Sequence, residues 1–412
     1  MHRKTAAAFI EPHRHRWEDK TPCFLVTTQG LREAMASLKT ELGGEIAYSY
    51  KTNPHPTIGR IILAEGASLL FSSVEELEAA AVLEGFSAAK AIFQSPSLTS
   101  QQLGHIWRIG VRRVIIDSHD QLAVVLENLP ADAELLIRVN TGVRVNDPAL
   151  PYGMDSFLGF PLCEAGEVFR QAQQLKREGR IARLGLHNHL LSQNTHLGVW
   201  RANAEVLADF VEKLKRQRIE LDTVDFGGGY PVAYHEPVPS LREIAAAIGS
   251  ARGRITACYP EIHFIFEPGR KVVAESISLL AKVVHLKNFV GQAVAILDCS
   301  LYNSSMDTLI VGLCPPTMKL DAEADAELLH YVIRGSSPDS LDVFWKSIML
   351  PQLRKGDCLA FVHAGAYSFS SDFISLAKPS YVFVEPVGRA PTRAHPAHVR
   401  LMEVCNEGAL HL

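Results

Sequence analysis

Between about residues 44 and 270, short apolar runs alternate with longer stretches that have the apolar spacing of helices. In residues 196–218, for example, apolar side chains recur every three or four positions, which is typical of an amphipathic helix. Parallel strands need helical crossovers, so the alternation predicts an α/β fold with a (β/α)8 TIM-like barrel. An open doubly wound sheet would alternate in the same way. The eight candidate strands are residues 45–51, 68–72, 91–95, 113–117, 134–140, 182–187, 222–226 and 262–266.

Polar motifs, one of them a run of glycines, fall at the carboxyl ends of these candidate strands. A barrel collects its active site from those ends, so their position favours the barrel over the open sheet. The residues concerned are Lys51, Ser72, Ser73, Arg138, Asn140, His187, Asn188, His189, Gly227, Gly228, Gly229 and Glu267.

After about residue 275 the sequence changes to apolar runs rich in Val, Phe and Tyr, with turn residues nearby, which predict β-strands at 293–298, 358–363 and 380–384. Residues 22–27 predict one more strand, which we expect to join the C-terminal sheet. The second domain would then be a β-sandwich or β-barrel that includes the N-terminal strand. The expected division is 1–35 for the N-terminal strand, 36–275 for the barrel and 276–412 for the β domain.

The composition indicates an ordinary globular protein. A net charge of −4 gives no reason to expect nucleic acid or an anionic membrane as a partner, and no apolar run approaches the ~20 residues that span a bilayer. The seven cysteines are widely spread and include no CxxC pair. This pattern indicates neither a disulfide framework nor a zinc site, and it fits a cytoplasmic protein.

Three segments together supply what pyridoxal phosphate needs. Lys51, in residues 48–54 (YSYKTNP), offers an amine for a Schiff base. The glycines of residues 225–231 (DFGGGYP) offer a backbone turn that can approach a phosphate, and an expected helical region after them suits anion binding. Residues 267–270 (EPGR) add a carboxylate for the pyridinium nitrogen and a guanidinium beside a tight turn.

Several of these residues have alternative interpretations. Lysines at strand ends are usually solvated, and glycine triplets are more often plain turns than phosphate sites. His187 and His189 are two apart on a strand and point to the same face, but a metal pair would need a third ligand, so no metal site is predicted. Arg138 is interpreted equally well as a cofactor contact or as a structural ion pair.

Over almost its whole length the chain resembles the fold type III pyridoxal-phosphate decarboxylases, which include the ornithine, arginine and diaminopimelate enzymes. The lysine motif of that family, aromatic-x-x-Lys-x-Asn, matches residues 48–53. Its His-x-His-hydrophobic-Gly-Ser segment matches residues 187–192, except that Leu191 replaces the glycine. Its Gly-Ala-Tyr motif matches residues 365–367.

The resemblance implies roles for the matching residues. Lys51 would hold the cofactor covalently, His189 would stack on its ring, and Glu267 would pair with the pyridine nitrogen. The catalytic residues expected in this way are Lys51, His189, Glu267 and Asp339. The expected cofactor contacts are Lys51, Arg138, His189, Ser192, Gly227, Gly228, Gly229, Glu267, Gly269, Arg270 and Tyr367.

The resemblance also implies a homodimer with shared active sites. In the family, two subunits pair head to tail, and the C-terminal segment of one subunit completes the site of the other. Asp339 would then act beside the partner's Lys51, and Tyr367 is a further candidate for such a role.

Two positions depart from the family pattern. The family's C-terminal domain has a cysteine that protonates the carbanion after decarboxylation, and Pro338 stands at that position. Proline has no proton to donate, although the following acid, Asp339, is retained and could meet a substrate amine. Diaminopimelate enzymes also have an arginine for the distal carboxylate, and Met306 stands there, which disfavours diaminopimelate as the substrate.

The expected function is therefore a pyridoxal-phosphate-dependent decarboxylase acting on an amino acid or an amino-acid-derived intermediate. A racemase or a decarboxylative transaminase would use the same cofactor chemistry and remains an alternative. From another class, the chain could be a catalytically inactive binding or regulatory protein that kept the fold.

Overall fold

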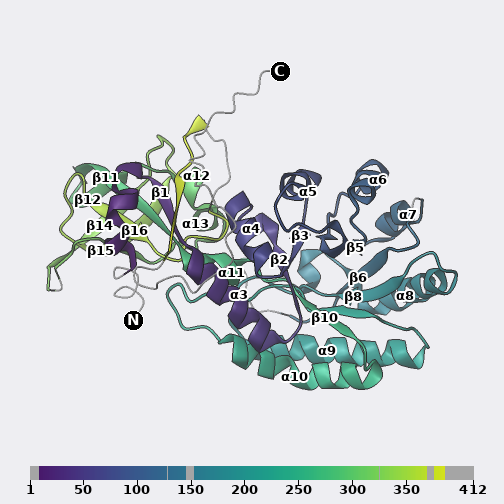
Figure 1. Cartoon of the computed structure of the whole chain (residues 1–412). Coiled ribbons are helices and arrows are strands. Elements are labelled where there is room, and N and C mark those ends of the chain that lie inside the picture. The colour runs from purple at the N-terminus through teal and green to yellow at the C-terminus, as the bar shows by residue number, and fades with distance from the viewer. Residues whose placement is uncertain (1–8, 128, 145–152, 324, 369–374, 386–412) are drawn as a thin grey trace, which may run out of the picture.

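The computed structural model describes residues 9–127, 129–144, 153–323, 325–368 and 375–385. Figure 1 shows two parts side by side: an α/β barrel formed by the middle of the chain, and a β domain that brings residues near both ends together. None of the described helices is both long enough and apolar enough to cross a bilayer.

Within the described residues, eight parallel strands form a closed barrel, which confirms the predicted (β/α)8 fold. Around the barrel the order is β2, β3, β4, β5, β6, β8, β9 and β10, and β10 pairs back with β2. A two-residue strand, β7 (Phe160–Pro161), pairs with the carboxyl end of β6 and was not predicted. The barrel strands are β2 (Glu45–Ser49), β3 (Ser68–Phe71), β4 (Ile92–Phe93), β5 (Arg113–Ile116), β6 (Glu134–Asn140), β8 (Arg183–His187), β9 (Thr223–Asp225) and β10 (His263–Phe266).

Helices surround this barrel (Figure 1) and bury their apolar faces against it. Several begin at side-chain caps: Ser240 and Glu243 form a capping box at the start of α10, and Thr99 and Gln102 do the same for α6. The barrel helices are α3 (Thr28–Leu42), α4 (Pro56–Ala64), α5 (Val74–Ala81), α6 (Ser100–Ile109), α7 (His119–Glu127), α8 (Leu162–Arg177), α9 (Leu197–Arg216), α10 (Leu241–Cys258) and α11 (Arg270–Val273).

The barrel interior is filled by aliphatic side chains rather than by a channel. Side chains from six strands form a separate apolar cluster inside the barrel, each 4% exposed or less. Such a packed interior leaves the strand ends as the place for polar chemistry. The cluster consists of Ala47, Leu70, Ile92, Ile115, Leu136 and Ile265.

The second sheet combines the N-terminal strand with the C-terminal strands, as predicted. The strand β1 pairs antiparallel with β11 and parallel with β17. From β13 to β15 the order is β13, β16, β11, β12, β14 and β15. The strands are β1 (Cys23–Thr27), β11 (Ile277–Phe289), β12 (Gln292–Leu297), β13 (Thr317–Lys319), β14 (Leu328–Arg334), β15 (Val343–Pro351), β16 (Cys358–Phe361) and β17 (Ser380–Val384).

Short helices complete the structure. They are the α-helices α2 (Arg14–Trp17), α12 (Leu301–Ser304) and α13 (Met306–Val311), and the 3₁₀-helices η1 (Glu11–His13), η2 (Glu18–Lys20), η3 (Tyr50–Thr52), η4 (Ala88–Lys90), η5 (Gly153–Ser156) and η6 (Ala274–Ser276).

The expected division at residue 35 does not suit the secondary structure, because it falls inside α3. The side chain of Thr27 accepts a hydrogen bond from Gly30 N and caps that helix, so the chain passes from sheet to helix at Thr27. We therefore propose a boundary between β1 and α3. The division near residue 275 lies where η6 leads into β11.

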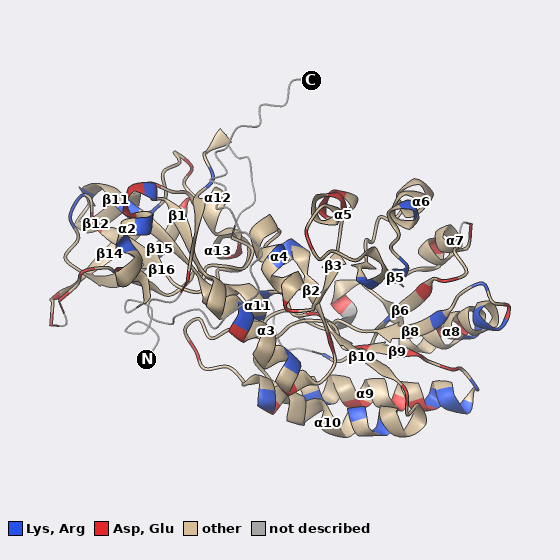
Figure 2. Cartoon of the chain, viewed as in Figure 1, with Lys and Arg blue, Asp and Glu red and all other residues tan. Residues whose placement is uncertain are grey.

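Charged side chains of both signs are interspersed on the outer helices (Figure 2). On α9 and α10 they interact across the helix pair, where Arg254 forms ion pairs with Glu205, Asp209 and Glu212. These ion pairs lie on the outer surface of the barrel. The polar residues at the strand ends are a different set.

Candidate active site

One cavity lies at the carboxyl ends of the barrel strands and is bordered by the β domain. It contains ten of the eleven expected cofactor contacts, and in addition Ser49, Leu70, Gln94, Leu158, Gln193 and Tyr230. The eleventh expected contact, Gly227, is not part of the lining. Asp339, which was expected as a catalytic residue and not as a cofactor contact, is also absent from the lining. The expected residues in the lining are Lys51, Arg138, His189, Ser192, Gly228, Gly229, Glu267, Gly269, Arg270 and Tyr367.

Lys51 lies just beyond β2 in the 3₁₀-helix η3. The backbone around it is tied by neighbouring side chains: Tyr48 Oη donates to Asn53 O at 3.1 Å, and Tyr50 Oη donates to Pro54 O at 3.0 Å. Asn53 Nδ2 donates in turn to Gly365 O of the β domain at 2.9 Å. The lysine motif therefore fixes the main chain from which the exposed Lys51 side chain reaches the cavity.

Tyr367 of the β domain lies in the cavity of its own chain, next to Lys51. Its backbone N–H donates to Thr52 O at 2.9 Å, and the Arg270 guanidinium carbon lies 5.1 Å from its ring centroid. The expectation that Tyr367 acts beside a partner's lysine is therefore wrong for this position. The two motifs instead join the barrel to the β domain of one chain.

The glycine segment adopts backbone conformations that other residues rarely take. Gly229 has φ +100°, and a Cβ there would lie 2.2 Å from Leu191 O. Gly227 has φ +68°, and its Cβ would lie 2.3 Å from Asn188 O. Glycine is thus required at both positions by the close approach of the loop that follows β8.

The glycine segment differs from the expected phosphate loop in two respects. No helix follows it directly, since α10 begins only at Leu241, so a helix dipole does not act there. Two of its amides already have partners: Gly227 N donates to Asp225 Oδ1 at 2.8 Å, and Gly228 N donates to His189 Nδ1 at 3.1 Å. The segment consequently shapes the cavity wall and orients His189.

His189 is held as a neutral imidazole. Burial lowers its pKa well below the usual value, and the nearby charges of Arg138 and Lys51 lower it further. A neutral ring whose Nδ1 accepts from Gly228 N carries its proton on Nε2. This state leaves the face of the ring apolar enough to pack against an aromatic group.

The two arginines of the cavity differ in their partners. Arg270 forms an ion pair with Asp307 of α13 and donates from Nη1 to Tyr234 Oη at 3.0 Å. Arg138 forms no ion pair with any described residue, and its buried Nε has no hydrogen-bond partner. Burial lowers the pKa of Arg138, while the charges of Asp117 and Glu267 act in the opposite direction. Arg138 is therefore the less neutralised cation of the cavity.

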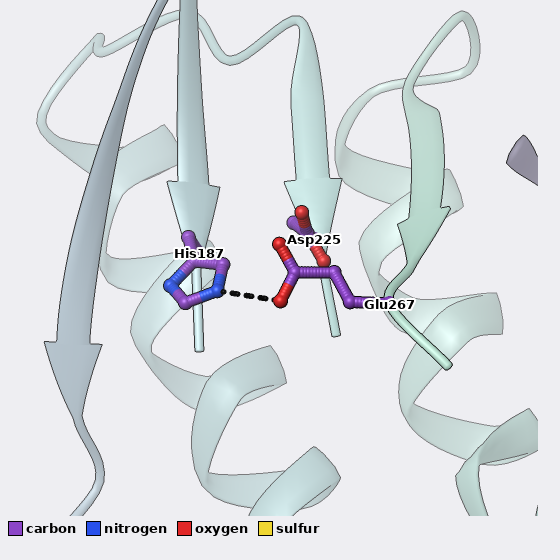
Figure 3. Close-up of side chains that lie close together, drawn as sticks. All are labelled: His187, Asp225 and Glu267. Carbon is purple, nitrogen blue, oxygen red and sulfur yellow. Dashed lines mark hydrogen bonds and ion pairs between the residues drawn. The ribbon is translucent and has the colours of Figure 1, made fainter. Parts of the chain in front are cut away.

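Glu267 lies beside two other buried polar residues (Figure 3). Its Oε2 is 3.3 Å from His187 Nε2, and Asp225 lies on its other side. Burial raises the pKa of Glu267, although Asp225 and nearby cations lower it in part. Its other oxygen, Oε1, is buried without a hydrogen-bond partner.

These features suit pyridoxal phosphate. Burying the Glu267 carboxylate is costly, and a protonated pyridine nitrogen in the cavity that Glu267 borders would offset this cost. The Arg138 guanidinium, which donates from Nη2 to His189 O but forms no ion pair with a described residue, and the Arg270 side chain give the cavity cations for an anionic ligand. The Lys51 amine borders the same space.

Some site residues were not found from the sequence. Asp225 ends β9 and was quoted only as part of the glycine motif, and the sequence did not show that it meets Glu267. Gln94 follows β4, so the strand-end rule that found the other residues could have found it. Gln193 lies in a loop, where no comparable signal exists; its side chain holds Val232 by hydrogen bonds to both N and O.

Comparison with known proteins defines the class of protein. The pyridoxal-binding domain of the pyridoxal-dependent decarboxylases matches residues 28–274. A diaminopimelate decarboxylase of Bacteroides thetaiotaomicron is 27% identical over 363 residues, which cover 84% of this chain and 91% of that protein. One of Methanothermobacter thermautotrophicus is 27% identical over 395 residues, covering 88% and 86%. The structure of a lysine/ornithine decarboxylase of Vibrio vulnificus complexed with cadaverine has a TM-score of 0.78 at 24% identity, covering 91% and 97%.

The protein is therefore a pyridoxal-phosphate enzyme built on a barrel and a β domain. Because the family model covers more than half of the sequence, the chain belongs to the pyridoxal-dependent decarboxylases. Its cofactor is pyridoxal phosphate, and its reaction class is that of the carboxy-lyases.

Proposed function

We propose that this protein decarboxylates an amino acid or an amino-acid-derived intermediate, with Lys51, Glu267 and the cavity cations as its working groups. The observation that carries the proposal is that Lys51 and Glu267 border one cavity with Arg138, Arg270 and Tyr367. When bound, pyridoxal phosphate supplies an aldehyde that bonds to amines and a ring that withdraws electrons from the bond to the leaving carboxylate.

Each group of the chain has a distinct task in this proposal. The Nζ atom of Lys51 would hold the cofactor and would move a proton at the reacting carbon. Glu267 would accept a hydrogen bond from the ring nitrogen. The neutral His189 packs against the ring without adding charge.

Other residues of the cavity lining would hold the phosphate. Arg270 would supply positive charge for it, partly balanced by the ion pair of Arg270 with Asp307. Ser192, Gly228, Gly229 and Tyr367 supply the surrounding polar surface. Arg138, which has no ion pair with a described residue, is left to attract the anionic part of the substrate.

Two observations point to different amino acids as the substrate. The matching proteins of Bacteroides and Methanothermobacter are named diaminopimelate decarboxylases, which favours diaminopimelate. Met306, at the start of α13, cannot bind a second carboxylate, which favours a substrate without one. Measuring CO2 release from diaminopimelate, lysine, ornithine and arginine decides between them. Proton exchange at the α carbon without CO2 release would indicate the alternative racemase.

We expect Lys51→Ala to abolish covalent attachment of the cofactor. Borohydride treatment of the wild-type protein should fix the cofactor onto the tryptic peptide that contains Lys51, as read by mass spectrometry. Lys271→Ala is a matched control, because Lys271 pairs with Glu275 outside the cavity and should leave the labelling unchanged. Labelling that persists in the Lys51→Ala protein would show that another lysine holds the cofactor.

We further propose a homodimer whose partner completes the site. Asp339 lies in the loop between β14 and β15 and does not border the cavity of its own chain. Leu341 in that loop is 63% exposed, and Ile310 on α13 is 68% exposed. Their burial between two subunits would bring the Asp339 loop to a neighbouring site.

A further inference from the structure

Asp225 is a buried carboxyl that the proposed reaction leaves without a task. It ends β9 and is 0% exposed, while Glu267 after β10 and His187 at the end of β8 are 4% and 0% exposed. Because β8, β9 and β10 are neighbours in the barrel, the three side chains meet below the cavity (Figure 3).

The two carboxyls cannot both be ionised without a nearby cation. Among the described residues, His187 is the only basic side chain within ion-pair distance of either of them. Burial lowers the pKa of His187 to about 4, so the imidazole is neutral near pH 7. A buried carboxyl pair in such surroundings retains one proton between its two members.

The positions of the two carboxyls indicate which member holds this proton, because Glu267 borders the cavity and Asp225 does not. Asp225 Oδ1 accepts from Gly227 N at 2.8 Å, whereas Oδ2 is buried and accepts from no described N–H or O–H group, so it can carry hydrogen. Burial raises the pKa of Asp225 well above its usual value, and the charge of Glu267 raises it further.

Glu267 is the member that ionises. Burial raises its pKa, but the hydrogen bond from Asp225 and the charges of Arg138 and Lys51 lower it. These cations act mainly on Glu267, which faces the cavity, and less on Asp225 behind it. The other ionisable side chains that act on the pair are Arg113 and Tyr230.

We propose that Asp225 is a positioning residue: it donates a hydrogen bond to the ionised Glu267 and thereby keeps the proton of the cofactor's ring nitrogen on nitrogen. This inference rests on the proposed function, in which Glu267 accepts that N–H. A donor lowers the proton affinity of the oxygen that accepts it. Without Asp225, Glu267 would draw the proton toward itself, and the ring would withdraw electrons less strongly.

A divalent cation is the alternative occupant of this cluster. One ligand-type atom from each of His187, Asp225 and Glu267 lies within 4.8 Å of the others, which would suit a metal. A metal would require Asp225 to be ionised, whereas its burial outside the cavity lining and the neighbouring charge of Glu267 favour its acid form. The protonation state of Asp225 therefore separates the two interpretations.

The first experiment measures that state in the cofactor-free protein. Asp225→Asn keeps the donor to Glu267 and the acceptor for Gly227 N, but it has no carboxyl. Difference infrared spectra at pH 7.5 should show the band of a protonated carboxyl in the wild-type protein and its loss in Asp225→Asn. Metal content measured on the same samples should be below one ion per chain in both. An absent carboxyl band, or one metal ion per chain that Asp225→Asn loses, would overturn the proposal.

The second experiment reads the ring nitrogen directly. Proteins loaded with ring-15N pyridoxal phosphate are compared by NMR as the wild type, Asp225→Asn and Asp225→Ala. The wild type and Asp225→Asn should show a protonated nitrogen, and Asp225→Ala a shift toward the unprotonated position. A shift as large in Asp225→Asn as in Asp225→Ala, or no shift in either, would refute a donor role.

The two experiments also separate this inference from the function on which it rests. If Lys51 proves not to hold the cofactor, the proposed function fails while the infrared result still stands. If Asp225→Ala does not fold, the infrared comparison of the wild type with Asp225→Asn alone still decides the proposal. Loss of cofactor labelling is not expected in Asp225→Asn, because Lys51 lies in η3 after β2, whereas Asp225 ends β9.

Discussion

Single residues of this protein are constrained by the backbone as much as by chemistry. The glycines after β9 illustrate this point, because they were predicted as phosphate contacts, yet two of their amides bond within the chain. Their lack of a side chain allows the loop after β8 to pass at contact distance. The sequence could reveal the glycines but not this neighbour, since the close approach depends on how two adjacent strands end.

Gly229→Ala should therefore destabilise the cofactor-free protein by about 2–5 kcal/mol, from the unfavourable φ and the collision with Leu191 O. Gly249→Ala is the matched control: Gly249 lies in α10 with nothing near its missing Cβ, and the change should stabilise by about 0.5–1 kcal/mol. Urea denaturation of the apo proteins measures both. Equal stability of Gly229→Ala and the wild type would contradict the steric explanation.

Titration of the single side chain His55 makes the stability of the folded protein depend on pH. Its Nδ1 accepts from Thr57 N and caps α4, and its ring packs on Tyr381 of β17 with centroids 4.3 Å apart. Burial lowers its pKa to about 4, with a smaller contribution from Arg60. The unfolded chain takes up this proton near pH 6.5, so stability from the neutral ring is lost as the pH falls from 6.5 toward 4.

We expect His55→Asn to weaken this dependence, since asparagine can cap the helix without titrating in that range. Between pH 7 and pH 5 the wild type should lose about 1–2 kcal/mol more stability than the variant. Urea titrations of both proteins at the two pH values, at one protein concentration, give the difference directly. Parallel losses would mean that His55 titrates normally in the folded protein.

At the scale of elements, the sequence predicted the barrel better than the β domain. Each of the eight predicted barrel strands corresponds to an observed one, because strands buried on both faces form continuous apolar runs. In the β domain, β11, β13, β14 and β15 were missed. The strand β14 begins with three exposed residues, and β11 ends with five, so neither shows an unbroken apolar run. Irregular register within β11 and between β14 and β15 further breaks the alternation of apolar and polar side chains.

The active site shows the same division. The sequence placed polar residues at strand ends, and the structure gathers ten of the eleven expected contacts around one cavity. The meeting of Asp225 with Glu267 follows only from the order β8, β9 and β10 in the closed barrel. Two motifs distant in sequence, around Lys51 and Tyr367, meet because the β domain packs on the barrel, which no local pattern reveals.

At the scale of the whole molecule, the proposed shared site predicts complementation between inactive proteins. Lys51→Ala and Asp339→Ala should each be inactive alone. Mixed under conditions of subunit exchange, they should recover up to roughly a quarter of wild-type activity, because random pairing gives one intact site in half of the dimers. In the control mixture, Glu323→Ala takes the place of Asp339→Ala. Glu323 lies on the β domain away from the cavity, so this variant should be active before mixing. Proven exchange without recovery would place each complete site within one chain.

The pairing of β1 determines how early in synthesis the β domain can complete its folding. Residues 23–26 pair with 277–280 on one side, and residues 23–27 pair with 380–384 on the other. The barrel can close once the ribosome has released residues up to about 270, but one edge of β1 stays unpaired until residues 380–384 have emerged. An early strand that waits for a late partner is exposed to wrong pairing, so the slow and vulnerable stage of folding belongs to the β domain.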